Sequence, residues 1–217
     1  MSRQHGETTT MKTLYIFLTR SGTLLSNLVY RLTGAQYTHI SLAFDEDLST
    51  LYSSTRKNGY TMFPAGPSRE YLNRGVFLMR ENIPCALYAL EVTDEAYIRA
   101  KRRTQHMMHH GELYRFNSLG LLLCWMHIRW QRRRHYFCSQ FVSEVLQKSG
   151  ALDLPKPSTL MHPSDYAELP QLRCLYRGTL ADLPQCQSME MGEVESVMGL
   201  YLSVLLGAVR GGVRHLF

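Results

Sequence analysis

The sequence predicts an α+β fold in which an antiparallel sheet packs against one strongly amphipathic helix. Short segments rich in β-forming residues occur at 14–18, 37–44 and 51–54, and turn-forming residues separate them. The segment 137–149 instead places apolar residues three and four apart, which is helical spacing. The 217 residues are 45% hydrophobic and 19% charged, so the chain is long and apolar enough for one core and is not disordered overall.

The first half of the chain supplies most of the predicted strands. The run Leu14–Leu18 has the length of a buried strand. A turn over 19–23 then leads to an expected helix over 24–32, which Gly34 ends. The segments 37–44 and 51–54 flank the acidic turn 45–47, and together they predict a β-hairpin.

Further elements are expected in the middle of the chain. Val76–Met79 and Ala86–Val92 are two more strand candidates. Residues 93–95 can cap a helix over 94–110. The helix over 137–149 ends at Gly150, and the segment 162–165 has the composition of a short helix start.

We expect three regions: a disordered tail at 1–10, one domain at 11–188, and an amphipathic helix at 189–217. The last region carries an apolar stripe and a stripe of small residues at every fourth position, Gly199, Ser203, Gly207 and Gly211. Small residues let another helix approach closely. The apolar stretch Val197–Val209 is 13 residues long, short of the roughly 20 that span a bilayer. The alternatives left open are packing on the domain, a homodimer, or peripheral membrane contact through this helix.

The charge and the cysteine content indicate which partners and which cellular compartment to expect. The net charge is +6 and the pI about 9.1, with arginines clustered near 99–103 and 129–134. This balance suits anionic partners, but the sequence lacks the aromatic and Cys/His signatures of nucleic-acid binders, so we expect no nucleic acid. The cysteines number five and have no regular spacing. They indicate free thiols in a cytoplasmic setting, with membrane association left open.

Several common chemistries are excluded by the absence of their motifs. The sequence has no Gly-x-Ser-x-Gly, no phosphate-binding Gly-x-x-x-x-Gly-Lys and no Gly-x-Gly-x-x-Gly. His106, His109 and His110 lack the glutamate of the zinc-protease helix, and a solvated helix end explains them better. We expect neither a metal nor an organic cofactor.

Cys138 stands out because it begins the predicted helix over 137–149. Helix N-termini carry unpaired N–H groups and partial positive charge, which favour a thiolate and can also hold an oxyanion. A thiolate needs a basic partner, and His39 lies on a predicted strand whose side chains can face a helix packed across it.

The local sequences around these two residues resemble those of a known family. Tyr37-Thr38-His39-Ile40-Ser41-Leu42-Ala43-Phe44, followed roughly a hundred residues later by Tyr136-Phe137-Cys138-Ser139-Gln140-Phe141-Val142, resembles the circularly permuted NlpC-type papain-like enzymes. That group includes YiiX-like proteins and relatives of lecithin:retinol acyltransferase, and in it the histidine strand precedes the cysteine helix. The opening strand, Tyr52-Ser53 and Pro163-Ser164-Asp165 are similar too, so the resemblance extends over about 14–169.

The resemblance implies Cys138 as nucleophile and His39 as general base. A third polar residue then orients the imidazole, and hairpin parity places Ser53 in that role. The family usually has a stronger acceptor there, so Ser53 is a departure from its pattern. Tyr37, two residues before His39 on the same strand, is expected to line the site.

The sequence therefore predicts a thiol hydrolase or acyltransferase that acts on an amide or ester bond in a peptide or lipid through a thioester. One alternative is a catalytically silent papain-like module that binds a ligand or docks on a membrane. A second, less favoured alternative is a basic nucleic-acid binder.

Overall fold

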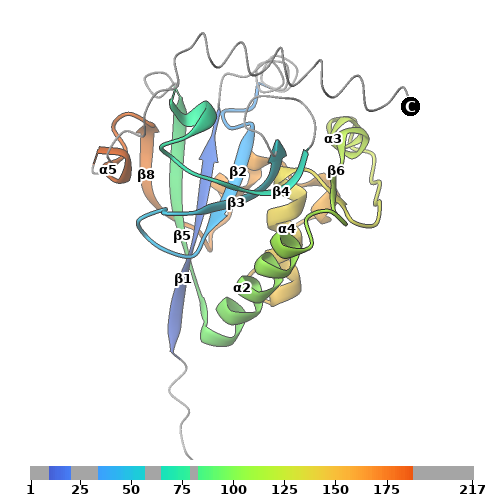
Figure 1. The fold of residues 1–217 in the computed structure, drawn as a ribbon, viewed down its shortest axis with the longest axis horizontal. Coiled ribbons are helices and arrows are strands. Elements are labelled where there is room, and N and C mark those ends of the chain that lie inside the picture. Colours follow the sequence, from blue (N-terminus) through green and yellow to red (C-terminus); the bar gives the residue numbers. More distant parts are fainter. Residues whose placement is uncertain (1–9, 21–33, 57–64, 79–82, 188–217) are drawn as a thin grey trace, which may run out of the picture.

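The structure, a computed structural model, describes residues 10–20, 34–56, 65–78 and 83–187. A six-stranded antiparallel sheet dominates these residues, in the order β4-β3-β2-β1-β5-β8 (Figure 1). Its strands are β1 (Met11–Thr19), β2 (His39–Ala43), β3 (Leu51–Arg56), β4 (Ala65–Glu70), β5 (Pro84–Thr93) and β8 (Arg173–Thr179). The predicted α+β class is thus confirmed.

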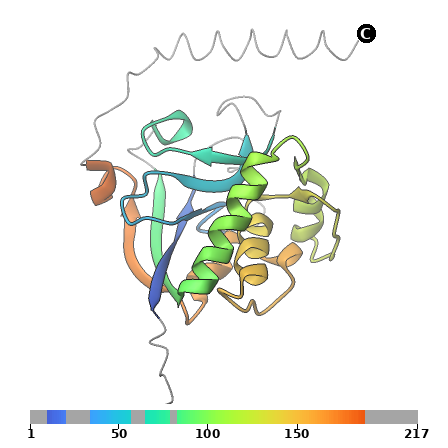
Figure 2. The ribbon, with the colours of Figure 1, turned by 60° about the horizontal axis from the view of Figure 1, so that its bottom comes forward.

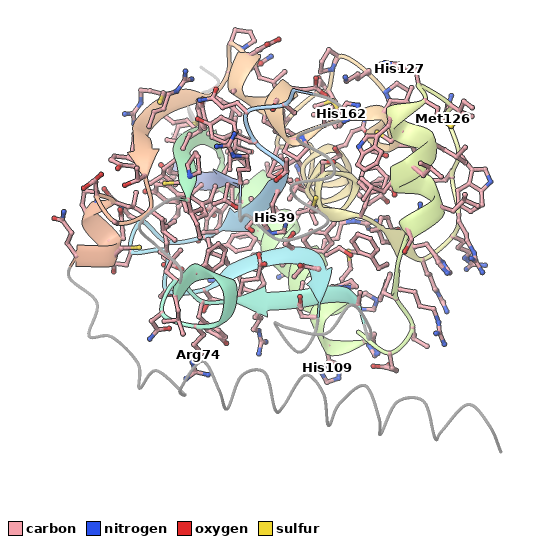
Figure 3. All side chains as sticks on the ribbon, turned by 90° about the horizontal axis from the view of Figure 1, so that it is seen from above. His39, Arg74, His109, Met126, His127 and His162 are labelled. Atoms are coloured by element: carbon pink, nitrogen blue, oxygen red, sulfur yellow. The ribbon has the colours of Figure 1, made fainter. Side chains whose placement is uncertain are left out.

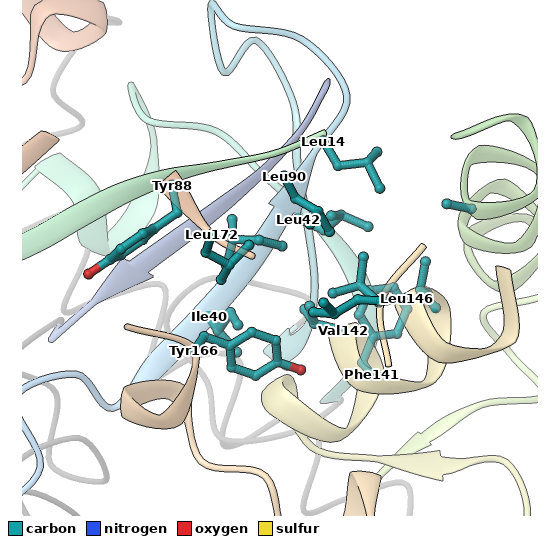
Figure 4. Packing of buried hydrophobic residues seen from close by; sticks show 14 of the residues in the cluster. Leu14, Ile40, Leu42, Tyr88, Leu90, Phe141, Val142, Leu146, Tyr166 and Leu172 are labelled. Atoms are coloured by element: carbon teal, nitrogen blue, oxygen red, sulfur yellow. The ribbon is translucent and has the colours of Figure 1, made fainter. Parts of the chain in front are cut away.

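The two longest of the described helices lie on one face of the sheet. The helix α2 (Asp94–His109) crosses beside α4 (Cys138–Ser149), and both pack against the strands (Figures 1 and 2). Figure 4 shows Ile40 and Leu42 of the sheet facing Phe141 and Val142 of α4. The apolar stripe that predicted this helix is therefore the stripe that builds the main core.

The opposite face carries a second, smaller core. Phe17 and Leu87 pack there with Phe77 of the 3₁₀ helix η1 (Gly75–Leu78) and with Leu183, which precedes α5 (Pro184–Gln187). Because β1 is central and buried on both faces, its sequence is a continuous apolar run rather than an alternating one.

Several predicted elements agree with the structure. Leu14–Leu18 lies within β1, and the hairpin 37–54 forms β2 and β3, paired at Leu42 and Tyr52. The segments 86–92 and 94–110 correspond to β5 and α2, and 162–165 begins the 3₁₀ helix η4 (Pro163–Glu168). Asp165 caps η4 by accepting a hydrogen bond from the His162 N–H at 2.6 Å.

One predicted strand is wrong and others were missed. Val76–Met79 was expected to be extended, but residues 75–78 form η1, whose first residue, Gly75, adopts a left-handed conformation at φ +61°. The strand β4 contains Gly66 and Pro67, which argue against a strand except at the edge of a sheet, and β4 is an edge strand.

A short parallel pair, β6 (Arg115–Phe116) and β7 (His135–Tyr136), flanks the helix α3 (Ser118–Trp125), which was also not predicted. A further 3₁₀ helix, η3 (Ser158–Leu160), contacts both α3 and α4. The expected tail at 1–10 (except residue 10), the helix over 24–32 and the C-terminal helix over 189–217 lie outside the described residues.

Candidate active site

Cys138 is fixed at the first turn of α4 by hydrogen bonds on both sides of it. Tyr136, two residues before it, offers its carbonyl to the Ser54 hydroxyl at 2.6 Å and to the Asn117 N–H at 3.3 Å. On the other side, the Ser139 hydroxyl donates to the Met161 carbonyl at 2.6 Å. These bonds tie the start of α4 to β3, to the segment before α3 and to η3.

The N-terminus of α4 has no side-chain cap. Its N-cap residue is Phe137, whose side chain cannot accept a hydrogen bond from the first turn. Unlike an Asp or Ser cap, this residue leaves the first N–H groups of the helix without a side-chain acceptor of its own. Such N–H groups beside a nucleophile are suited to hold an oxyanion.

His39 begins β2 and its ring is held by a carboxylate. Its Nε2 lies 3.0 and 3.1 Å from the two carboxylate oxygens of Glu70. The Ser41 hydroxyl donates to Glu70 at 2.6 Å and lies 3.2 Å from the same Nε2. Glu70 ends β4, which is separated from β2 by β3 in the sheet. Figure 3 shows His39 near the centre of the molecule, seen from above.

The electrostatic surroundings favour a charged His39. Burial of the ring opposes its charged form, but the Glu70 carboxylate and hydrogen bonding with Cys138 outweigh burial and raise the pKa of His39 to about 10. The side chains of His39 and Glu70 are only 15% and 12% exposed, so water screens the pair weakly. Because Glu70 engages Nε2, we expect Nδ1 to be the ring nitrogen that meets the thiol.

The described residues include all five cysteines, and Cys138 differs from the other four. None is in a disulfide. Burial raises the pKa of Cys85 and of Cys124 to about 12, so both are held as thiols at neutral pH. Cys174 is exposed but is not at a helix start, and Cys186 is buried. Cys124 also contacts an imidazole, that of His162 at 3.6 Å. Cys138 is 8% exposed, begins the helix α4, and interacts with a histidine whose pKa is raised.

Ser53 does not take the place that the sequence suggested. Its hydroxyl donates to the backbone carbonyl of Ile40 at 2.8 Å, and Glu70 is the residue that engages the His39 ring. The parity argument placed Ser53 on a suitable strand, but pairing of Leu42 with Tyr52 sets Ser53 nearer Ser41 than His39. A serine side chain is too short to span that offset.

Tyr37 is likewise placed in the core and not on a surface open to substrate. Its ring is buried, and its N–H donates to the Ser164 hydroxyl at 3.2 Å. Burial raises the pKa of Tyr37, and the charge of Arg177 on β8 acts in the opposite direction. In the described part of the chain its phenol oxygen has no hydrogen-bond partner.

Glu70 is the site residue that sequence reasoning missed. Its strand contains glycine and proline, so no strand was predicted there, and nothing local links Glu70 to His39. The sequence signal that could have indicated Glu70 is its position as an acidic residue shortly after the predicted hairpin that carries His39.

Potential metal ligands were compared across the described part of the chain. Within the described ranges, no group of three or more His, Cys, Asp or Glu side chains is arranged to hold a metal ion. His106 and His109 lie on the last turn of α2, with their rings 4.6 and 4.8 Å from that of His110. Among the helices that the structure describes, none has the length and apolar character needed to cross a membrane.

Comparison of the chain with protein-family models, with curated proteins and with solved structures finds no match.

The role of Ser53 can be tested by removing its hydroxyl. We expect Ser53→Ala to lower the free energy of unfolding by about 1 kcal/mol, because a buried bond to the Ile40 carbonyl is lost. The rate of Cys138 alkylation at pH 7 should stay within about twofold of wild type. Denaturant unfolding and iodoacetamide kinetics measure the two effects. If Cys138 of Ser53→Ala were alkylated as slowly as Cys138 of His39→Ala, Ser53 would be the residue that orients the His39 ring.

The raised pKa of His39 also makes stability depend on pH. The folded protein binds the imidazole proton more tightly than the unfolded chain, whose histidine has a pKa near 6.5. This contribution is therefore complete below about pH 6.5 and is lost as the pH rises towards 10. We expect the unfolding free energy of wild type to fall more between pH 7 and 10 than that of His39→Gln. Parallel curves for the two proteins would contradict the assignment.

Proposed function

We propose that the chain is a cysteine-dependent hydrolase or acyltransferase, built on a circularly permuted papain-like fold and acting on an amide or ester bond. The observation that carries this proposal is the set of partners of the His39 ring: its Nε2 lies 3.0 Å from a Glu70 carboxylate oxygen, and hydrogen bonding with Cys138 contributes to its raised pKa. A nucleophile, a base and a group that orients the base are the parts needed for covalent acyl transfer.

The first half of the proposed reaction forms a thioester. The Cys138 thiolate attacks the substrate carbonyl carbon, and the N–H groups at the start of α4 hold the resulting oxyanion. As the carbon–nitrogen or carbon–oxygen bond breaks, the His39 imidazolium gives its proton to the leaving amine or alcohol.

In the second half, the neutral His39 takes a proton from water or from another acceptor as that group attacks the thioester. The acyl product leaves, and thiolate and imidazolium are restored. Glu70 stabilises the imidazolium in both halves, with Ser41 donating to the carboxylate. The free cysteines support a cytoplasmic setting for this chemistry.

The hypothesis of a catalytically silent module is less well supported than the enzyme hypothesis. It depended on Ser53, a weak partner for an imidazolium, and the structure supplies a carboxylate instead.

The test uses p-nitrophenyl acetate as an activated ester, in a Cys174→Ser background that removes the exposed thiol. We expect a burst of p-nitrophenol and a mass increase of one acetyl group on the peptide containing Cys138. Cys138→Ala should abolish both, whereas the matched buried control Cys186→Ala should not. Acetylation spread over other residues, or none at Cys138, would overturn the proposal.

A further inference from the structure

The helix α3 shows an apolar side to solvent. Leu119, Leu122 and Met126 are spaced three and four residues apart, so they share one side of the helix, and they are 53%, 50% and 60% exposed. Gly120 and Cys124 occupy the buried side. Figure 3 shows Met126 at the outer edge of the molecule, well away from His39.

Exposed large apolar residues are concentrated in this part of the described chain. Five of the eight lie between residues 113 and 128, namely Leu113, Leu119, Leu122, Met126 and Ile128; the others are Met11, Ile98 and Leu175. Scattered exposed leucines are ordinary on protein surfaces, but a helix side composed of them marks an interaction site. We call Leu119, Leu122 and Met126, which share one side of the helix, the α3 patch.

A basic segment follows the α3 patch in the sequence. Arg129, Arg132, Arg133 and Arg134 are all exposed. In the described parts of the chain, none of the four forms an ion pair with an acidic side chain. Their charge is therefore available to an external anionic partner.

We propose that the α3 patch and these four arginines form a docking surface for a bilayer that contains anionic lipid. The apolar side chains would enter the boundary between headgroups and acyl chains, and the arginines would stay at the level of the phosphates. This surface is separate from the C-terminal segment 189–217 and does not depend on the proposed function.

The composition of the surface favours a bilayer over other partners. A second copy of the chain would bring the same arginines against each other at a two-fold interface, and like charges would repel. A nucleic acid would pair with the arginines but would leave the apolar side chains of the α3 patch without a hydrocarbon partner. An anionic bilayer satisfies both groups at once.

The test is co-sedimentation of the full chain with phosphatidylcholine vesicles, with and without phosphatidylserine, at low and high salt. We expect binding that requires phosphatidylserine and weakens with salt. Leu122→Ser together with Met126→Ser should weaken it at least tenfold. Arg132→Gln together with Arg133→Gln should weaken it about 25-fold, or about fivefold for each arginine.

Matched controls come from exposed positions elsewhere. Ile98→Ser replaces an exposed apolar residue of α2, and Lys101→Gln with Arg102→Gln removes two exposed charges from the same helix. These variants should bind vesicles like wild type. Absent binding, or equal binding by the α3 variants, would overturn the proposal. So would light scattering that shows a dimer dissociated by the α3 substitutions, or RNA that binds equally well after Leu122 and Met126 are replaced.

Discussion

Replacing His39 with alanine should slow the alkylation of Cys138 by iodoacetamide at pH 7 by roughly tenfold or more. Uncoupled cysteines are only a few per cent thiolate at this pH, and in the proposed pair the charged His39 ring is the group that stabilises a thiolate at Cys138. Acetylation by p-nitrophenyl acetate should fall by a similar factor, because p-nitrophenolate leaves without being protonated and the rate therefore follows the fraction of thiolate.

The measurement is made in the Cys174→Ser background, so that Cys138 is the accessible thiol. His109→Ala, which removes an exposed histidine from the end of α2, is the matched control and should react like its parent. The difference between His39→Ala and its parent should shrink as the pH approaches 10, since bulk base then deprotonates thiols without help. An unchanged alkylation rate in a folded His39→Ala variant would mean that the two residues do not act as a pair.

Glu70→Gln should lower the pKa of His39 and reduce acetylation of Cys138 by roughly 10- to 100-fold. The glutamine amide has the size of the carboxylate but lacks its negative charge. That charge is the main factor that raises the pKa of the His39 ring. Nuclear magnetic resonance of the His39 ring follows the shift directly, and the burst of p-nitrophenol follows the rate.

Two comparisons sharpen this result. Glu91→Gln removes an exposed carboxylate from β5 and should leave both measurements unchanged. Ser41→Ala removes the hydrogen bond to Glu70 but keeps its charge, so its effect should be smaller than that of Glu70→Gln. If the His39 ring had the same pKa in wild type and in Glu70→Gln, Glu70 would not be the group that raises the pKa of His39.

The strands and the helix that carry His39 and Cys138 were predictable because their signals are local. The continuous apolar run in β1, the alternating hairpin of β2 and β3 and the apolar stripe of α4 each follow from residues within a few positions of one another. Hydrophobic periodicity determines which side of each element is buried. The sequence by itself therefore determined the α+β class, the strand of His39 and the helix start at Cys138.

The third group of the site was decided by tertiary structure. Glu70 contacts His39 because β4 pairs with β3 at the edge of the sheet. Strand propensity does not predict β4, because proline is unfavourable within a strand and β4 contains Pro67. Ser53 had the right parity, but parity gives a face of the sheet and not the offset along it. The burial of Tyr37 and the exposure of Leu122 also depend on which distant segments cover them, since an apolar side chain looks the same in sequence whether it faces a core or a partner.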